Sequence, residues 1–195
     1  MGNLIKKELR AQVLDYRRLV AASVFKNRNQ VINEKIIHLL AKQRTRELHV
    51  FLPMTKNQEP DCLSAIRWAW KNGIATLTTK TDFANRSLQH FFFEENTMIK
   101  TSSKGIPEPL NGIETNLTET EVILVPLLVF DKNGHRIGYG GGYYDKILSE
   151  INPDTLKIGL CLSGGMDAFN FVEAHDQPLD MIITPFETLE INEQH

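Results

Sequence analysis

The sequence has few of the features that mark secreted or membrane-bound proteins. It contains only two cysteines, Cys62 and Cys161, and their spacing matches neither a disulfide framework nor a paired metal site. No apolar run approaches the roughly 20 residues needed to cross a bilayer. The charged N-terminus lacks the apolar stretch of a signal peptide. We therefore predict a cytoplasmic protein with no membrane partner, whose two thiols are buried and reduced.

No internal repeat, low-complexity tract or long linker divides the 195 residues. This length fits one domain with a sizeable hydrophobic core. The apolar fraction of 42% and the charged fraction of 24% are ordinary for a soluble globular protein. The prediction is a single domain spanning residues 1–195, present as a monomer or a weak homodimer.

The charge is unevenly spread along the chain, although the net charge is only −2. Residues up to Arg46 hold 11 basic and three acidic side chains, whereas the rest of the chain holds 11 basic and 21 acidic ones. A basic N-terminal part suggests an anionic partner, and the alternative is a set of solvated helix faces. The basic part lacks interleaved aromatic residues and any nucleic-acid motif, so we expect no nucleic-acid partner.

Hydrophobic periodicity predicts helices that alternate with strands. Apolar residues recur at helical spacing in several segments, and short apolar runs between them suit buried strands. The predicted helices cover 4–25, 31–42, 61–72 and 143–150, and the predicted strands cover 48–52, 74–78, 122–125, 157–162 and 181–184. In the middle we predict a hairpin formed by 88–93 and 97–100, followed by a rigid non-helical loop at 105–109.

This alternation indicates an α/β fold. We predict three α/β/α layers around a mostly parallel, Rossmann-like sheet, because helices between strands provide the crossovers that parallel strands need. Such sheets bind their ligands at the carboxyl ends of the strands. The segment that follows the predicted strand 122–125 is therefore the first candidate for a site.

The segment from Val125 to Lys146 joins an apolar run to a glycine cluster and then to a helix. Five of the chain's 12 glycines lie between Gly134 and Gly142. Glycines let successive N–H groups approach one anion, and a following helix adds its own free N–H groups. The pattern is neither Walker A nor Gly-x-Gly-x-x-Gly. It predicts a phosphate-binding loop, with a glycine-rich hairpin turn as the structural alternative.

Residues 130–145 carry a more specific pattern, Phe-Asp-Lys-Asn-Gly-His-Arg-Ile-Gly-Tyr-Gly-Gly-Gly-Tyr-Tyr-Asp. This segment closely resembles the signature of the 5-formyltetrahydrofolate cyclo-ligase family, also called methenyltetrahydrofolate synthetases. Weaker similarities occur in the family's order along nearly the whole chain. They lie at residues 6–10, 51–53 with Glu59, 105–109, 176–180 and 183–185.

The resemblance implies an ATP-driven cyclisation. The formyl oxygen of 5-formyltetrahydrofolate takes the γ-phosphoryl group, N10 attacks the activated carbon, and phosphate leaves to give 5,10-methenyltetrahydrofolate. Such chemistry requires that the two substrates are held in line, that phosphate charge is neutralised and that water is excluded. Two other hypotheses are a paralogue acting on another formylated or thiamine-related compound, and a non-catalytic nucleotide-binding module.

The same resemblance assigns an ATP site and makes Arg136 and Tyr143 the catalytic candidates. Without it, Arg136 could form a surface salt bridge, and Lys6 and Arg10 would be solvated charges on one helix face. The two tyrosines that follow Gly142 could pack on a ligand ring or between helix and sheet. The residues assigned to ATP are Lys6, Lys7, Glu8, Leu9, Arg10, Arg136, Ile137, Gly138, Tyr139, Gly140, Gly141, Gly142, Tyr143 and Tyr144.

The resemblance also implies that Asp145 and Asp176 hold Mg²⁺. The ion favours one or two carboxylates together with phosphate oxygens and water, which suits two acids from separate segments. The alternatives are a first-turn helix charge for Asp145 and an ordinary turn acid for Asp176. Asp131 is assigned to a tight turn, because Asp-Lys-Asn-Gly is a typical turn sequence.

For the folate, the resemblance implies Leu52 and Glu59. A carboxylate suits the ring N–H and amino group of a pterin, whereas the alternatives are a core leucine and an exposed loop acid. The stretch between Pro53 and Glu59 is about two residues longer than in many relatives, so the choice of Glu59 depends on where the insertion is placed. The chain also departs from many relatives at Lys104, where they carry an aromatic residue before Gly-Ile-Pro.

Overall fold

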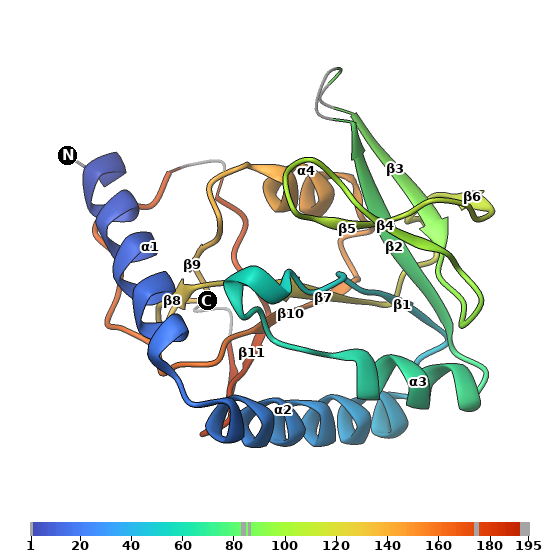
Figure 1. Cartoon of the computed structure of the whole chain (residues 1–195), viewed down its shortest axis with the longest axis horizontal. Helices are drawn as coiled ribbons and strands as arrows, with labels where there is room; N and C mark the ends of the chain where they lie inside the picture. Colours follow the sequence, from blue (N-terminus) through green and yellow to red (C-terminus); the bar gives the residue numbers. More distant parts are fainter. Residues whose placement is uncertain (1, 83–84, 86, 174–175, 192–195) are drawn as a thin grey trace.

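The computed structural model describes residues 2–82, 85, 87–173 and 176–191, which form a mixed, mostly parallel sheet with helices on both faces (Figure 1). The sheet contains β1 (Glu47–His49), β2 (Ala75–Asp82), β3 (Ser87–Phe92), β6 (Glu114–Thr115), β7 (Val122–Pro126), β10 (Leu156–Leu160), β11 (Met181–Ile183) and β12 (Thr188–Glu190). Their order is β12-β11-β10-β7-β1-β2-β3-β6. The strands from β11 to β2 run parallel, and β12, β3 and β6 pair antiparallel at the edges.

The helices and two small ribbons complete the fold. The helices are α1 (Gly2–Leu19), α2 (Ala22–Gln43), α3 (Leu63–Lys71) and α4 (Tyr143–Glu150), with one 3-10 turn, η1 (Thr55–Asn57). The ribbons pair β4 (Ile99–Thr101) with β5 (Pro107–Pro109), and β8 (Val129–Phe130) with β9 (Arg136–Ile137). Among the described helices, none has the length and apolar character needed to cross a bilayer.

Strand β7 shows why helices cover both faces of the sheet. Its side chains alternate between the two faces, as the pleat of a strand requires. Val122 and Leu124 pack in the core under α2 and α3, whereas Ile123 and Val125 pack in the core under α4. Both sets are buried, which is typical of a parallel strand inside three layers. The predicted α/β/α architecture is therefore confirmed (Figure 1).

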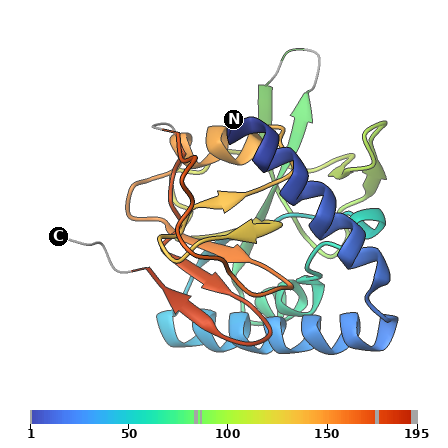
Figure 2. The ribbon, with the colours of Figure 1, turned by 90° about the vertical axis from the view of Figure 1, so that its left-hand side faces the viewer.

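The N-terminal helices differ from the prediction. The predicted helix over 4–25 ends at Leu19, and α2 starts at Ala22 and runs through the predicted gap to Gln43. The turn between them uses a bond from the Val20 N–H to the Arg17 carbonyl and an extended Ala21. No glycine or proline marks this turn, because tertiary packing decides it. Helix α1 packs beside β8, whereas α2 packs under the sheet (Figure 2).

The predicted hairpin between 88–93 and 97–100 is wrong. Strand β3 pairs with β2 and β6, and β4 pairs instead with β5 inside the segment predicted as a loop. Prolines at both ends of β5 suit an edge position, since they cannot donate ladder hydrogen bonds. Strand pairing over this distance depends on partners that local patterns do not reveal.

Other local predictions are confirmed. Helix α4 has the predicted bounds, and Gly73 follows α3 with a φ of 72°, the left-handed conformation of a C′ glycine. Cys62 and Cys161 are both free and buried. Burial in the core also raises the pKa of the Cys62 thiol.

Candidate active site

A cavity of about 350 Å³ lies at the carboxyl ends of three parallel strands. His49 at the end of β1, Thr81 near the end of β2 and Pro126 at the end of β7 form part of its wall. The remaining wall comes from α1, the glycine loop, the start of α4 and the segment around residue 173. The sheet therefore brings a site together where the sequence predicted one.

The glycine loop forms one end of the cavity. Gly140 and Gly142 adopt φ values of 89° and 70°, which side chains rarely tolerate, and Gly142 precedes the first turn of α4. At Gly141 a Cβ atom would lie 2.6 Å from the ring of Tyr143. The loop thus exposes backbone next to a helix N-terminus, an arrangement suited to an anion.

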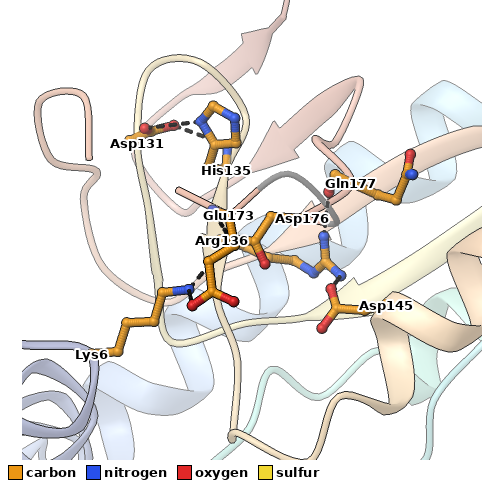
Figure 3. A network of polar contacts seen from close by, with 8 residues as sticks. All are labelled: Lys6, Asp131, His135, Arg136, Asp145, Glu173, Asp176 and Gln177. Atoms are coloured by element: carbon orange, nitrogen blue, oxygen red, sulfur yellow. Dashed lines mark hydrogen bonds and ion pairs between the residues drawn. The ribbon is translucent and has the colours of Figure 1, made fainter. Parts of the chain in front are cut away.

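Arg136, in β9 just before the glycine loop, contacts both α4 and the segment around Gln177. Its side chain is only 6% exposed, and it contacts Asp145 Oδ1 at 2.5 Å and the Gln177 carbonyl at 2.5 Å (Figure 3). Burial lowers the pKa of Arg136, and the charges of Asp145 and Asp176 oppose this shift. A solvated surface salt bridge, the alternative weighed for Arg136, does not describe this buried guanidinium.

Helix α1 contributes two cations to the same end. Lys6 Nζ lies 3.3 Å from Asp176 and 3.4 Å from Glu173, and its side chain is only 13% exposed (Figure 3). Arg10 Nε donates to the Gly138 carbonyl at 2.8 Å. Both residues line the cavity. Helix α1 reaches it because its apolar side chains pack against the β8–β9 ribbon that precedes the glycine loop.

Not every residue assigned to ATP reaches the cavity wall. Of that set, the wall includes Lys6, Arg10, Arg136, Gly138, Tyr139, Gly140, Gly141, Gly142, Tyr143 and Tyr144. Lys7 and Glu8 are exposed on another face of α1, and Leu9 and Ile137 belong to the apolar contact between α1 and the β8–β9 ribbon. These four residues of the set therefore do not line the cavity.

The carboxylates at this end fit a magnesium ion that takes most of its ligands from elsewhere. Asp145, Glu173 and Asp176 all line the cavity, where Arg136 pairs with Asp145 and Lys6 pairs with both Glu173 and Asp176. Among the described residues, no group of three acidic, histidine or cysteine side chains forms a cage for a metal. The donor set suits Mg²⁺ bound mainly through phosphate oxygens and water.

Asp131 serves the turn and not the cavity. Its buried carboxylate accepts hydrogen bonds from the backbone N–H groups of Asn133, His135 and Phe169 at 2.8–3.0 Å. It also lies 3.2 Å from the His135 ring (Figure 3). The turn predicted for Asp131 is confirmed, and these bonds tie it to the segment around Phe169.

Glu59 belongs to a second part of the cavity wall, which differs in chemistry from the charged part. Its side chain is buried, and its carboxylate accepts a 2.6 Å bond from the Met54 N–H. Burial raises the pKa of Glu59 to about 7, although the Met54 N–H, the Tyr139 hydroxyl and Arg17 all favour the charged form. The exposed loop acid, the alternative for this position, is therefore excluded.

Tyr139 and Arg17 connect Glu59 with the glycine loop. Arg17 donates to the Tyr139 hydroxyl at 2.9 Å and to the Leu127 carbonyl at 2.7 Å, and Tyr139 in turn interacts with Glu59. Burial raises the pKa of Tyr139. Sequence reasoning missed Arg17, which is buried. The available signal was a basic residue four positions after Val13 on the apolar side of α1.

Apolar side chains form much of the wall in this second part, together with Thr78, Thr79 and Thr81. Leu52 and Phe51 are buried there, and Ile106 and Pro107 belong to the wall at the start of β5. Tyr144 packs in both cores, as the helix–sheet alternative describes, and it also lines the cavity. The cavity wall thus has two parts that differ in chemistry: a charged, glycine-lined part, the glycine end, and a more apolar part with one buried carboxylate, the apolar end.

Comparison with known proteins shows the family of the chain. The family model described as the 5-formyltetrahydrofolate cyclo-ligase family matches residues 3–185. The chain belongs to this family. A probable 5-formyltetrahydrofolate cyclo-ligase of Schizosaccharomyces pombe is 26% identical over 199 residues, covering 94% of this chain and 96% of the relative. The cyclo-ligase of Mycoplasma genitalium is 29% identical over 160 residues, covering 80% and 82%.

Two solved structures of the family share the fold. A 5,10-methenyltetrahydrofolate synthetase of Aquifex aeolicus superposes with a TM-score of 0.78 at 23% identity, covering 98% of this chain and 95% of that one. A synthetase of Mycoplasma pneumoniae gives a TM-score of 0.73 at 22% identity, covering 92% and 98%. The cyclo-ligase fold therefore extends over nearly the whole chain.

Proposed function

We propose that this protein uses ATP to convert 5-formyltetrahydrofolate into 5,10-methenyltetrahydrofolate, with release of ADP and phosphate. The observation that supports the proposal most strongly is one cavity with two ends of different chemistry. One end is cationic and lined by glycine, and the other is apolar with a buried carboxylate. Membership of the cyclo-ligase family supports the same reaction.

In this proposal the glycine end holds the ATP phosphates. The backbone N–H groups of the loop and of the first turn of α4 would supply neutral donors. Lys6, Arg10 and Arg136 supply positive charge around them, and Arg136 offers a planar fork suited to phosphoryl oxygens. Tyr143 lies against the loop at Gly141, so its ring fixes the loop's shape. Arg136 and Tyr143 are the proposed catalytic residues.

Asp145 and Asp176 would hold Mg²⁺ against these phosphates. Bound there, the ion would neutralise phosphoryl charge and orient the transferred group. The side chains of Arg136 and Lys6 already keep the two carboxylates at the cavity wall. Binding of MgATP would exchange part of these ion pairs for contacts with the metal and the phosphates.

The apolar end holds the folate in this proposal. Glu59 would accept hydrogen bonds from a ring N–H and the amino group of the pterin, while Leu52 packs against its face. Two such donors stabilise the charged carboxylate, so folate binding would lower the pKa of Glu59 from its value of about 7. The buried carboxylate is costly without a ligand, which is expected of a binding group.

The proposed chemistry needs alignment and little covalent participation by the protein. The formyl oxygen attacks the γ-phosphorus and ADP leaves. N10 then attacks the formyl carbon and loses its proton, and the carbon–oxygen bond breaks with its electron pair leaving on phosphate. With both substrates in one cavity, the residues would act by positioning them, balancing charge and excluding water.

A direct assay tests the proposal. Purified protein is mixed with 5-formyltetrahydrofolate, ATP and Mg²⁺, and the absorbance of methenyltetrahydrofolate is followed, with separate controls lacking ATP or Mg²⁺. We expect a signal that needs ATP and is strongest with Mg²⁺. Protein that binds ATP but forms no product contradicts the proposal and favours a nucleotide-binding module. ATP cleavage that requires a different formylated or thiamine-related compound favours a paralogue.

We also propose a cytoplasmic monomer or weak homodimer that acts on small molecules, without a nucleic-acid or membrane partner. The proposal is supported by the two free, buried cysteines and by the direction of the N-terminal cations. Lys6 and Arg10 point to the cavity wall and so account for part of the basic excess of the N-terminal residues. Size-exclusion chromatography coupled to light scattering tests the assembly state.

A further inference from the structure

Arg17 is a buried arginine of α1 to which the proposed binding of ATP and folate gives no role. It is only 3% exposed. Its Nη1 donates to the Tyr139 hydroxyl at 2.9 Å, and its Nη2 donates to the Leu127 carbonyl at 2.7 Å. Both acceptors are neutral, and within the described part of the chain the buried Nε has no hydrogen-bond partner. Burying a cation among neutral groups is costly, so its position calls for a functional reason.

The bond between Arg17 and Tyr139 fixes the direction of the Tyr139 proton. An arginine side chain can only donate hydrogen bonds, and a tyrosine hydroxyl carries a single proton. Tyr139 must therefore accept from Arg17 and use its own proton elsewhere. That proton goes to Glu59, the other side chain that forms a hydrogen bond with Tyr139. Burial raises the pKa of Tyr139, so the hydroxyl keeps this proton at neutral pH.

Packing holds the Tyr139 ring in this arrangement. The ring packs against the small apolar cluster around the β8–β9 ribbon, and so do the apolar side chains of α1. Leu127, whose carbonyl accepts the second bond of Arg17, lies just before β8. The two bonds of Arg17 therefore tie the Tyr139 hydroxyl to the same part of the fold that supports the ring.

The bonds to Glu59 leave part of its carboxylate for a ligand. A carboxylate offers about four acceptor positions. Glu59 uses one for the Met54 N–H at 2.6 Å and another for the Tyr139 hydroxyl. The remaining positions match the ring N–H and the neighbouring amino group of a pterin. A protonated Glu59 would present an O–H group to these donors, so the pterin requires the ionised form.

Opposing influences decide whether Glu59 is ionised. Burial favours the neutral acid, whereas a backbone N–H, the Tyr139 hydroxyl and the charge of Arg17 favour the carboxylate, and the resulting pKa is about 7. The charge of Glu59 also reaches Cys62 before α3 and Tyr144 at the start of α4. Burial raises the pKa of both groups, so they stay neutral near pH 7. Tyr139 and Arg17 are therefore the side chains that favour ionisation.

We propose that Tyr139 and Arg17 are positioning residues for Glu59, which favour its ionised form and leave its remaining acceptor positions to the pterin. This inference rests on the proposed function and deepens it. Arg17 touches neither substrate and acts through the Tyr139 hydroxyl. The site then selects ring systems that offer two adjacent hydrogen-bond donors, and it binds them best above the pH at which Glu59 ionises.

Folate binding at several pH values tests the role of the Tyr139 hydroxyl. Tyr139→Phe keeps the ring and removes only the hydroxyl. The dissociation constant of 5-formyltetrahydrofolate is measured by titration calorimetry without ATP, from about pH 6 to about pH 9. We expect binding by wild type to weaken below a pH of about 7. In Tyr139→Phe this weakening should begin roughly one pH unit higher, since a hydrogen bond to a charged group is lost. The variant should bind roughly 10-fold more weakly at pH 6 and almost normally at pH 9.

The pH dependence separates this role from a structural one. A loop that the substitution merely disturbs would bind folate more weakly at every pH, and such a constant loss would overturn the inference, as would identical profiles of variant and wild type. Tyr16→Phe is the matched control and should match wild type throughout, because the Tyr16 hydroxyl also accepts from an arginine, Arg28, at 3.1 Å but at the surface. Wild-type protein that binds no folate at any pH fails the proposed function instead.

Further variants test the connection from Arg17 to Glu59. Arg17→Met should shift the profile in the same direction as Tyr139→Phe, and Arg17→Lys, which keeps a charged donor, should restore part of it. Arg18→Met removes an exposed cation of the same helix and is the matched control. In a Glu59→Gln background, Tyr139→Phe should change the folate dissociation constant by less than about twofold, because the group on which it acts is gone. An equal loss in both backgrounds contradicts the positioning role.

Discussion

The two ends of the cavity hold their charges in different ways. At the glycine end, Arg136 and Lys6 pair with three carboxylates, and the paired segments lie far apart in the chain. At the apolar end, Glu59 is buried with only partial compensation from the Met54 N–H, Tyr139 and Arg17. In the proposed function, the first arrangement would exchange its partners when charged phosphate binds. The second would gain its missing hydrogen-bond donors from the ligand.

Because of this difference, the two ends suit different kinds of ligand. Paired charges around exposed backbone suit a highly charged ligand with its own cation. A buried carboxylate in an apolar wall rejects ligands that lack matching donors, because its desolvation is then uncompensated. Tyr139 belongs to both ends, as part of the glycine loop and as a partner of Glu59. Tyr139 is therefore the side chain that the two ends share.

Loss of the Arg136 charge should have the largest effect. We expect Arg136→Met to reduce kcat roughly 1,000-fold, because a cation that stabilises a transferring phosphoryl group contributes about that much. The KM for folate should change little if the two ends act separately. Steady-state kinetics with both substrates measure this, and Arg46→Met, which removes an exposed surface cation, is the control. A parallel rise in the folate KM would break the comparison.

Glu59→Gln should act on the other substrate. Replacing the carboxylate by an amide removes a charge-assisted pair of hydrogen bonds, and we expect the folate KM to rise roughly 30- to 100-fold at an unchanged ATP KM. Glu34→Gln on the exposed face of α2 is the matched control. An unaffected folate KM would show that a different acid reads the pterin, as a different placement of the 53–59 insertion would imply.

Alanine at Gly141 should disturb only the glycine end. The new Cβ would lie 2.6 Å from the Tyr143 ring, so either the loop or the ring must move. We expect the ATP KM to rise roughly 10-fold, in line with a moderate overpacking cost. Gly164→Ala is the control, since no atom lies within 4 Å of its added Cβ. Equal effects of the two substitutions would argue against a shaped loop.

The smallest effect concerns stability and pH. The pKa of Glu59 is about 7 in the folded protein against 4.5 without burial, so the folded state binds its proton more tightly. This contribution to the free energy of unfolding is complete below pH 4.5, falls as pH rises to about 7 and is lost above it. The span corresponds to at most about 3 kcal/mol.

Urea unfolding between pH 4.5 and 8 measures this contribution as a difference between wild type and Glu59→Gln. We expect wild type to lose stability relative to the variant as pH rises through this range. A difference that stays constant across the range would mean that Glu59 is already ionised and compensated without folate. The contrast between the two ends would then disappear.

Local chemistry made much of the glycine end predictable. The loop needs glycines for its backbone conformation, and the helix after them needs only its own periodicity, so α4 and the loop agree with the prediction. The family resemblance supplied Lys6, Arg10 and Asp176, which the fold brings to one wall. No local pattern shows that α1 turns at Val20 to reach this wall, because packing against β8 decides that turn.

The apolar end was less accessible to sequence reasoning. Glu59 was identified by resemblance, but its burial and raised pKa depend on Tyr139 and Arg17, which lie 80 and 42 positions away. Likewise, His49 shows nothing unusual in the sequence. Its hydrogen bond to Thr79, which in turn contacts His90, forms only after β2 and β3 pair in the sheet. Hydrogen-bond partners across strands depend on register, which local patterns leave open.

The sequence by itself determined the α/β class, the helix at Tyr143–Glu150 and a phosphate-type loop before it, because periodicity and glycine conformation act over a few residues. The tertiary structure alone decided where α1 turns, which strands pair beyond Phe92, and which polar groups become buried. Burial depends on everything that packs around a group. Desolvation therefore changes Glu59 and His49 in ways that no neighbouring residue in the chain announces.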